Sequence, residues 1–421
     1  MGTFMREVSL MAKGGGMAFK KRWIFITTIC IGMSSCLPLN LLGAGEFIVT
    51  PKIAVGWQVD SNYWKSEDDE QEVFTYLIQP GIELGYETGK SLVSLNYTAN
   101  QFFYDDQDSV AAGQRKASDD DYLGHTFLFQ SETRPSARML LGVDDSFYLT
   151  SNPGQADRLG NSTDRDKYWV NRFHPRVYND FSPRLAAGLQ YRNEILKWID
   201  GDNDDSVENR GIGDLVYNIS PTAQLNFEGQ HWQRDFDGNT SDYTSNQLRL
   251  ILRKQFKNIS FEAGGGYQDR SFDDSDQDDI NTPAWMGAIT GQWPPAPDRA
   301  STRFSLTFDQ NFNDTGLGSG YYVARRVSLV LGHIFLEKIE TSIEGYYQNS
   351  DYEEYRGLTS SGDIDDRDDD TYEILGRVGY RLVDWMTIYV AGGYENRDSN
   401  IVGLDYDNKF LRARVDCKFE F

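Results

Sequence analysis

Four histidines are the side chains in this sequence best suited to proton transfer or to activating a nucleophile. They are His125, His174, His231 and His333. A hydrolase would need a histidine paired with a serine or an aspartate at the same depth in the fold. His231, four residues before Asp235, is the nearest candidate for such a pair. We interpret the histidines as ordinary structural residues and expect no enzyme activity, with a hydrolase built on His231 as the least favoured alternative.

Runs of carboxylates are the second feature with chemical potential, because hard oxygen ligands at short spacing can bind Ca²⁺. The runs are Glu67–Glu70, Asp119–Asp121, Asp202–Asp205, Asp273–Asp276 and Asp363–Asp366. None matches the twelve-residue calcium loop, with its glycine at position six and glutamate at position twelve. The sequence therefore predicts no cofactor and no defined metal site. The alternative is that divalent cations loosely bridge these carboxylates to lipopolysaccharide phosphates.

The composition excludes several classes of protein. The 64 acidic and 41 basic residues give a net charge of −23, which excludes nucleic acid as a partner because nothing neutralises a phosphate backbone. Aromatic residues make up 14% of a chain that has few long apolar runs. Such a composition fits apolar residues spread singly along strands. Cys30 and Cys36 lie within the first 44 residues, so Cys417 is the one cysteine of residues 45–421. That part of the chain therefore has no internal disulfide.

The elements that must position these residues are strands. Apolar and polar residues alternate along many segments, as where Val93, Leu95 and Tyr97 alternate with polar neighbours. This period of two predicts strands, and no segment has a sustained helical period. Short connections such as 88–90 and 133–135 alternate strictly with long acidic ones such as 60–72 and 353–370. The alternation predicts about eighteen strands, an even number that places both termini on the short-turn side.

A sheet with one apolar and one polar face, joined in this way, is typical of a membrane barrel. Lipid cannot hydrogen-bond to backbone groups, so a spanning sheet must close on itself. We therefore predict an all-β, transmembrane, antiparallel up-and-down β-barrel with short periplasmic turns and long acidic extracellular loops. A soluble secreted β-protein is the structural alternative.

The N-terminal residues have the features of a targeting segment. Lys20, Lys21 and Arg22 precede an apolar run that is too short to span a bilayer, and small residues follow up to Ala44. We predict a signal peptide over 1–44, with Met17 as the true start, and a barrel over 45–421. Cleavage after Ala44 is favoured, and lipidation at Cys36 is the alternative.

The C-terminal strand supports export to the cell outer membrane of a Gram-negative-type bacterium. It alternates apolar and polar residues and ends with Phe419 and Phe421. A last strand ending in phenylalanine resembles the signal that the barrel-assembly machinery reads. Phe419 and Phe421 are therefore the predicted assembly signal. Outer-membrane lipid and lipopolysaccharide are the expected surroundings, and a homo-trimer is suggested by fold analogy alone.

The polar face of the strands carries charges of both signs. The candidate lumen-lining residues are Glu194, Glu228, Glu262, Glu344, Arg377, Arg381, Arg412 and Arg414. Rows of opposite charge facing each other would create a field across a pore and orient polar solutes. The alternative is that these residues form cross-strand ion pairs that only hold the wall together.

The first strand carries a family resemblance. Residues Phe47–Gly56, running into Asp60, Ser61 and Asn62, are an apolar-Pro-apolar strand followed by an Asp/Asn-rich turn. This opening resembles that of the putative beta-barrel porin type 2 family, and the whole mature chain has that family's length and hairpin rhythm. The resemblance implies an outer-membrane barrel of uncertain cargo, sometimes associated with polysaccharide export.

We expect a channel for passive or weakly selective diffusion of small polar solutes. The acidic mouth would concentrate cations and repel anions, giving a cation preference. The alternative is a non-conducting surface barrel whose acidic extracellular loops bind a polysaccharide, a phage or another cell. Eighteen strands leave an aqueous channel unless a loop folds inward.

Overall fold

The computed structural model describes most of the predicted mature chain. The described residues are 45–110, 114–156, 162–274, 277–294, 300–312 and 321–420. The predicted leader 1–44, with Met17, Cys36 and Ala44, lies outside the described residues, as does Phe421.

Eighteen strands make up nearly all of the described chain. They are β1 (Glu46–Asp60), β2 (Val73–Glu87), β3 (Ser91–Asp106), β4 (Tyr122–Ser136), β5 (Met139–Thr150), β6 (Tyr168–Ser182), β7 (Leu185–Trp198), β8 (Ser206–Ser220), β9 (Ala223–Phe236), β10 (Tyr243–Gln255), β11 (Ile259–Phe272), β12 (Ile280–Trp293), β13 (Ser301–Phe312), β14 (Tyr322–Phe335), β15 (Ile339–Leu358), β16 (Ile364–Val383), β17 (Met386–Ser399) and β18 (Tyr406–Lys418). Two 3-10 helices, η2 (Ala117–Asp120) and η3 (Pro153–Gln155), lie in the connections. Among the described residues, no helix is long and apolar enough to cross a membrane.

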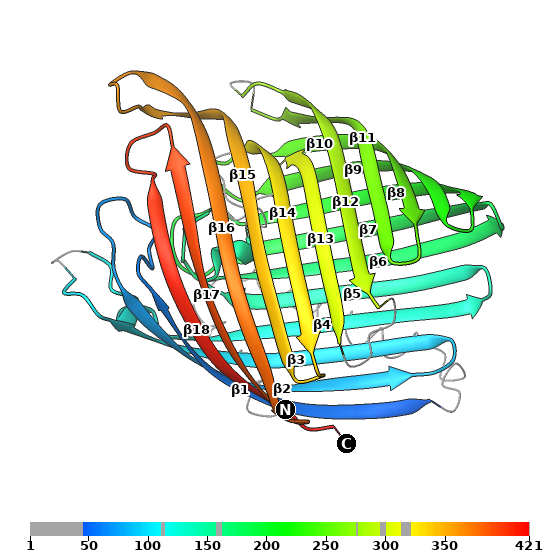
Figure 1. Ribbon diagram of the computed structural model, residues 1–421. Coiled ribbons are helices and arrows are strands. Elements are labelled where there is room, and N and C mark those ends of the chain that lie inside the picture. The colour runs from blue at the N-terminus through cyan, green and yellow to red at the C-terminus, as the bar shows by residue number, and fades with distance from the viewer. Residues whose placement is uncertain are drawn as a thin grey trace, which may run out of the picture. The chain divides into compact units, whose positions relative to one another are not determined.

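The strands form one closed antiparallel sheet. Each strand pairs with its neighbours in sequence, and β1 closes the sheet against β18. The closing register runs from Lys52 opposite Lys418 to Asp60 opposite Phe410. In Figure 1 the strands follow one another in chain order around the barrel, with β1, β18 and β2 together at its base. The predicted all-β barrel and its strand number are confirmed.

The two faces of the sheet have opposite character. Leu189, Leu248 and Ile343 are more than half exposed on the outer face. On the inner face, Glu208 and Arg234 are fully buried. Successive side chains of a strand point to opposite sides, so the alternation read in the sequence places carboxylates and guanidinium groups inside. An outer wall with this much exposed apolar surface is suited to lipid.

Two connections differ from the sequence prediction. β15 continues to Leu358 and β16 starts at Ile364, so most of the predicted loop 353–370 is a hairpin. Arg356 lies opposite Asp366 there, beyond a register shift that begins at Asp351. Residues 365–370 of β16 are all charged, so this part of the hairpin lacks the alternation that identifies a half-buried strand. β4 also runs to Ser136, past the predicted turn at residues 133–135.

Candidate functional site

The inner wall of β6–β9 carries a buried network of guanidinium and carboxylate groups. The register places Arg172, Glu194, Glu208 and Arg234 directly opposite one another on successive strands. Glu194 accepts from Arg172 Nε at 2.6 Å and from Arg234 Nη2 at 2.8 Å. The same Arg234 nitrogen lies 3.0 Å from Glu208 Oε2. Each carboxylate therefore neutralises arginines on both sides of it.

Glu208 is the centre of this network. Its side chain is 0% exposed, and Arg192 Nη2 donates to Glu208 Oε1 at 2.5 Å. Arg210 Nε donates to the same oxygen at 3.1 Å. Three guanidinium groups thus converge on one carboxylate. Arg192 shares the parity of Glu194 along β7, which was the available signal, but Glu194 was the only member of this network among the predicted lumen-lining residues.

The other predicted acidic residues have partners close by on the same wall. Glu228 Oε1 accepts from Arg249 Nη2 at 2.5 Å, and Glu262 Oε2 accepts from Arg253 Nε at 2.7 Å. Glu344 Oε1 accepts from Ser342 Oγ at 3.1 Å. Glu194, Glu228 and Glu262 therefore lie beside arginines of neighbouring strands. That these three glutamates line an open channel stays a prediction.

The predicted arginines lie on β16 and β18. Arg377 Nη2 is 3.5 Å from Glu340 Oε1, which also accepts from Arg303 Nη2 at 3.2 Å. Arg412 lies over the Phe410 ring at 4.4 Å, and Arg414 donates to Asp416. Arg381 is exposed close to the short-turn end of β16. These four residues spread over the wall and do not converge on one point.

Two hollows in the wall bring some of the predicted residues together. One has a volume of about 640 Å³ and is lined by Arg303, Glu344 and Arg377, among others. The other has a volume of about 390 Å³ and is lined by Arg253 and Glu262, with the backbone around Thr222. Both lie toward the short-turn end of the barrel. They are open recesses of a polar wall and contain no grouping typical of a catalytic centre.

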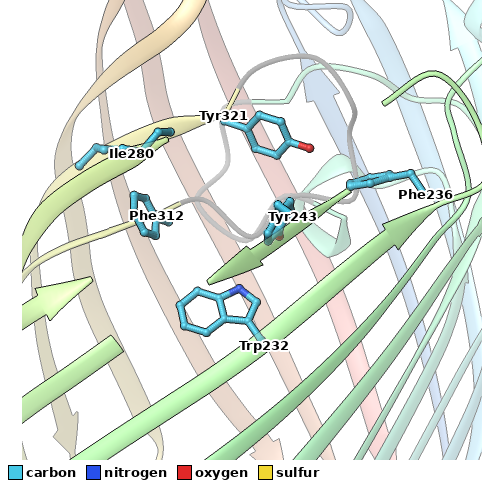
Figure 2. Packing of buried hydrophobic residues seen from close by; sticks show 7 residues of the cluster. Trp232, Phe236, Tyr243, Ile280, Phe312 and Tyr321 are labelled. Carbon is cyan, nitrogen blue, oxygen red and sulfur yellow. The ribbon is translucent and has the colours of Figure 1, made fainter. Parts of the chain in front are cut away.

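An aromatic cluster covers the opposite, long-loop end of β9–β14. Its buried members are Trp232, Phe236, Tyr243, Ile280, Phe312, Tyr321 and Val323. Figure 2 shows the labelled side chains converging from several strands. The Arg270 guanidinium lies 4.0 Å from the Tyr243 ring centre and 4.6 Å from that of Phe312. The buried guanidinium group of Arg270 is thus held against aromatic faces, which stabilise its charge.

His231 and Asp235 each have other partners and do not form a pair, whereas His174 Nδ1 lies 3.9 Å from Asp144 Oδ2. His231 Nδ1 lies 2.8 Å from Asn246 Oδ1, whereas Asp235 accepts from Gln233. His125 contacts the Tyr97 hydroxyl at 2.9 Å, and His333 contacts Thr302 Oγ1 at 2.8 Å. His174 Nε2 is 3.0 Å from Gln190 Oε1. Within the described part of the chain, no three His, Cys, Asp or Glu residues are grouped so as to hold a metal ion.

The C-terminal segment is fastened to both neighbours at the barrel seam. The Phe419 amide donates to the Pro51 carbonyl at 3.0 Å, and its ring stacks on Trp385 with centroids 5.4 Å apart. Phe421, the other half of the predicted assembly signal, lies outside the described residues. The role of both residues in assembly stays a prediction.

Several solved structures have a similar arrangement of strands. OpdK of Pseudomonas aeruginosa, crystallised with vanillate, is 11% identical, with a TM-score of 0.48 over 89% of this chain and 99% of that chain. OccK7 (OpdD) of the same organism is 10% identical, with a TM-score of 0.48 over 90% of this chain and 100% of that chain. OccAB3 of Acinetobacter baumannii is 10% identical, with a TM-score of 0.45 over 89% and 100%. No curated protein matches the chain.

A family model matches the second part of the barrel. Residues 257–419 match the family described as Putative beta-barrel porin 2. The match covers β11–β18 and does not include the opening strand at 47–56, which carried the resemblance in the sequence. Over these residues the chain is similar to the putative beta-barrel porin 2 family, and the closed eighteen-stranded sheet with its apolar outer face is the fold of an outer-membrane β-barrel.

Proposed function

We propose that this barrel is a channel for passive or weakly selective diffusion of small polar solutes, with a preference for cations. The observation that carries the proposal is the polar inner face of β6–β11, on which carboxylates and arginines of neighbouring strands neutralise each other. A wall balanced in this way favours water and polar solutes without trapping one ion. The proposal includes no catalytic step and no cofactor.

The cation preference is assigned to the rim of the barrel. Exposed carboxylates stand in the long connections, among them Asp68, Asp69, Asp273 and Asp363. Such a rim raises the local concentration of cations and lowers that of anions, and added salt screens the effect. The same carboxylates would hold divalent cations only loosely.

Planar-bilayer recording of the purified mature protein tests the proposal. Stable conductance steps are expected, with a reversal potential in a salt gradient that shows cation preference and shrinks as ionic strength rises. A folded, heat-modifiable barrel that gives no steps would refute the channel. Steps with anion preference would refute the assignment to the acidic rim.

A surface barrel that binds a partner is the second candidate, and the β15–β16 hairpin favours it. Leu358 and Ile364 at its tip are 56% and 76% exposed, and Val402 beside them is 57% exposed. Apolar residues at the tip of a water-facing hairpin are typical of a contact site. Binding of whole cells or polysaccharide that is lost on replacing Leu358 and Ile364 by serine would support this candidate.

Assembly is proposed to follow the usual route for barrels of this type. The barrel-assembly machinery would read the last strand with Phe419 and Phe421, and the surrounding lipid would include lipopolysaccharide. A homo-trimer is the proposed oligomer. Mass measurement of the detergent-purified protein would distinguish a trimer from a monomer.

A further inference from the structure

The outer face of the barrel carries a carboxylate, that of Asp145, in the middle of β5. The preceding residue, Asp144, forms an ion pair with Arg176, which shares the inward parity of Arg172 on β6. Successive side chains of a strand point to opposite sides of the sheet, so Asp145 points outward. β5 runs from Met139 to Thr150, which places Asp145 well away from both ends of the strand.

The side chains around Asp145 are apolar. Val143 and Phe147 flank it on the same face of β5. Phe129 on β4 and Phe173 on β6 lie directly opposite it, one on each side. The Asp145 side chain is half-buried among these residues. A charged group is thus placed within an apolar stretch of the outer wall.

The depth of Asp145 in the wall is unusual for a charge. Lys197 and Asp269 also point outward, but they lie near the long-loop ends of β7 and β11. The middle of the wall holds apolar residues such as Leu250 on β10 and Leu329 on β14, which are 50% and 41% exposed. Asp145 therefore stands at a depth where acyl chains surround a barrel of this kind.

Two polar residues of the neighbouring strands share this part of the outer face. Asn171 on β6 donates from Nδ2 to Asp145 Oδ1 at 2.6 Å and to the Ser146 carbonyl at 3.3 Å. Ser131 on β4 lies opposite Val143, which makes it a diagonal neighbour of Asp145 on the same face. We call Ser131, Asp145 and Asn171 the polar patch. It crosses β4, β5 and β6, which are adjacent in the sheet (Figure 1).

A carboxylate facing lipid is costly, because acyl chains offer no hydrogen-bond donor and no counterion. Asn171 supplies a neutral amide and leaves the charge of Asp145 uncompensated. Ionisable residues at membrane depth are rare and commonly mark a functional contact. A protein surface that covers the polar patch would remove the carboxylate from lipid and supply donors to it.

We propose that the polar patch is a contact surface between copies of this chain in the membrane. All copies insert in the same direction, so a rotation axis that relates them lies along the bilayer normal, and residues of two copies meet at equal depth. Near such an axis the polar patch approaches the same patch of the neighbouring copy. The Ser131 hydroxyl of one copy can then donate to the Asp145 carboxylate of the other. The inference rests on the proposed homo-oligomer, names the surface that forms it, and does not depend on conductance.

Cysteine cross-linking in isolated outer membranes locates the contact. In a Cys417→Ala background, which leaves residues 45–421 without a cysteine, Val143→Cys places one thiol beside Asp145 on the outer face. A short bis-maleimide should link most of this variant into covalent dimers. Leu250→Cys and Leu329→Cys are the matched controls on other parts of the outer wall, and they should give few dimers.

Replacement of the carboxylate tests what holds the copies together. Asp145→Leu removes a lipid-facing charge, so the barrel should still fold and remain heat-modifiable on SDS gels. The dissociation constant of the oligomer, measured by sedimentation equilibrium in detergent, should rise about tenfold, as expected for the loss of a polar contact between membrane segments. Asn246→Leu is the matched control. It removes an outward amide that contacts His231 and Asp269 near the long-loop end of β10, and it should leave the dissociation constant unchanged.

The outcomes separate the patch from the oligomer and from the channel. A wild type that is monomeric in membranes and in detergent would overturn the oligomer and the patch together, while bilayer recording would still decide the channel function. An oligomer that cross-links through Leu250→Cys or Leu329→Cys but not through Val143→Cys would overturn the patch alone. Links from Val143→Cys only to other proteins would overturn self-association there. An Asp145→Leu oligomer as stable as the wild type would overturn the role of Asp145.

Discussion

At the scale of single residues, the charged side chains on the inner face of the barrel are stabilised because several arginines share each carboxylate as a counterion. Glu208 is contacted by Arg192, Arg210 and Arg234 and has no exposed side-chain surface. A buried charge is costly unless it is paired and hydrogen-bonded. Each arginine in turn needs the carboxylate, so the network should fail as a unit when its central residue is neutralised.

Glu208→Gln should therefore destabilise the barrel by about 3 kcal/mol, because guanidinium groups lose their buried counterion. The midpoint of guanidinium-chloride unfolding in lipid vesicles measures this loss. Glu262→Gln is the matched control, since its partner Arg253 is 36% exposed. The control should cost less than about 1 kcal/mol. Equal losses of stability in the two variants would show that the Glu208 network stabilises the barrel no more than the Glu262–Arg253 pair does.

At the scale of elements, the short turn between β14 and β15 shows where the local sequence opposes the local backbone. Leu336 and Glu337 are the two central residues of this turn, with φ values of 50° and 63°. The Lys338 amide closes the turn on the Phe335 carbonyl at 3.0 Å. Hairpin turns with two positive φ values match the twist of the flanking strands, but they favour Asn and Gly over residues with larger side chains.

The double substitution Leu336→Asn and Glu337→Gly should stabilise the barrel by about 1 kcal/mol, because it removes the strain while keeping the turn. The same vesicle unfolding experiment measures the gain. Leu336→Ala keeps a Cβ in the strained position and should give no comparable gain. A double variant no more stable than the wild type would mean that the turn residues do not limit the free energy of unfolding, and that the flanking strands determine it.

The strands themselves were predictable from sequence where one face meets lipid and the other meets water. Val93, Leu95 and Tyr97 on β3 are such a case, and the structure confirms it. The extension of β15 past Asp351 was not predictable, because it pairs with the charged run 365–370, which shows no apolar–polar alternation. The contact of Lys65 with Glu395 joins residues 330 positions apart in a loop without periodicity. No local pattern identifies such a contact, although the parity of Arg172 and Arg234 with the predicted glutamates could have revealed the wall network.

At the scale of the whole molecule, the barrel depends on a seam that no turn connects. β1 and β18 lie at opposite ends of the barrel sequence and are joined by backbone pairing from Lys52–Lys418 to Asp60–Phe410. Val415 lies opposite Val55 on one side and Ile388 on the other, so its backbone is paired with both neighbouring strands. Unpaired backbone groups are not tolerated in lipid, so closure and insertion should be one event.

Val415→Pro should abolish the folded barrel, because proline removes a donor and cannot be accommodated within a central strand. Migration on SDS gels with and without heating measures folding, and membrane fractionation measures insertion. Val415→Ala removes the apolar side chain but keeps the backbone amide, so it should still insert and remain heat-modifiable. If the alanine variant failed as completely as the proline variant, side-chain packing at the seam would be the cause. A folded, inserted Val415→Pro barrel would show that the β1–β18 seam tolerates a missing ladder bond, and that closure is secured by the remaining pairs.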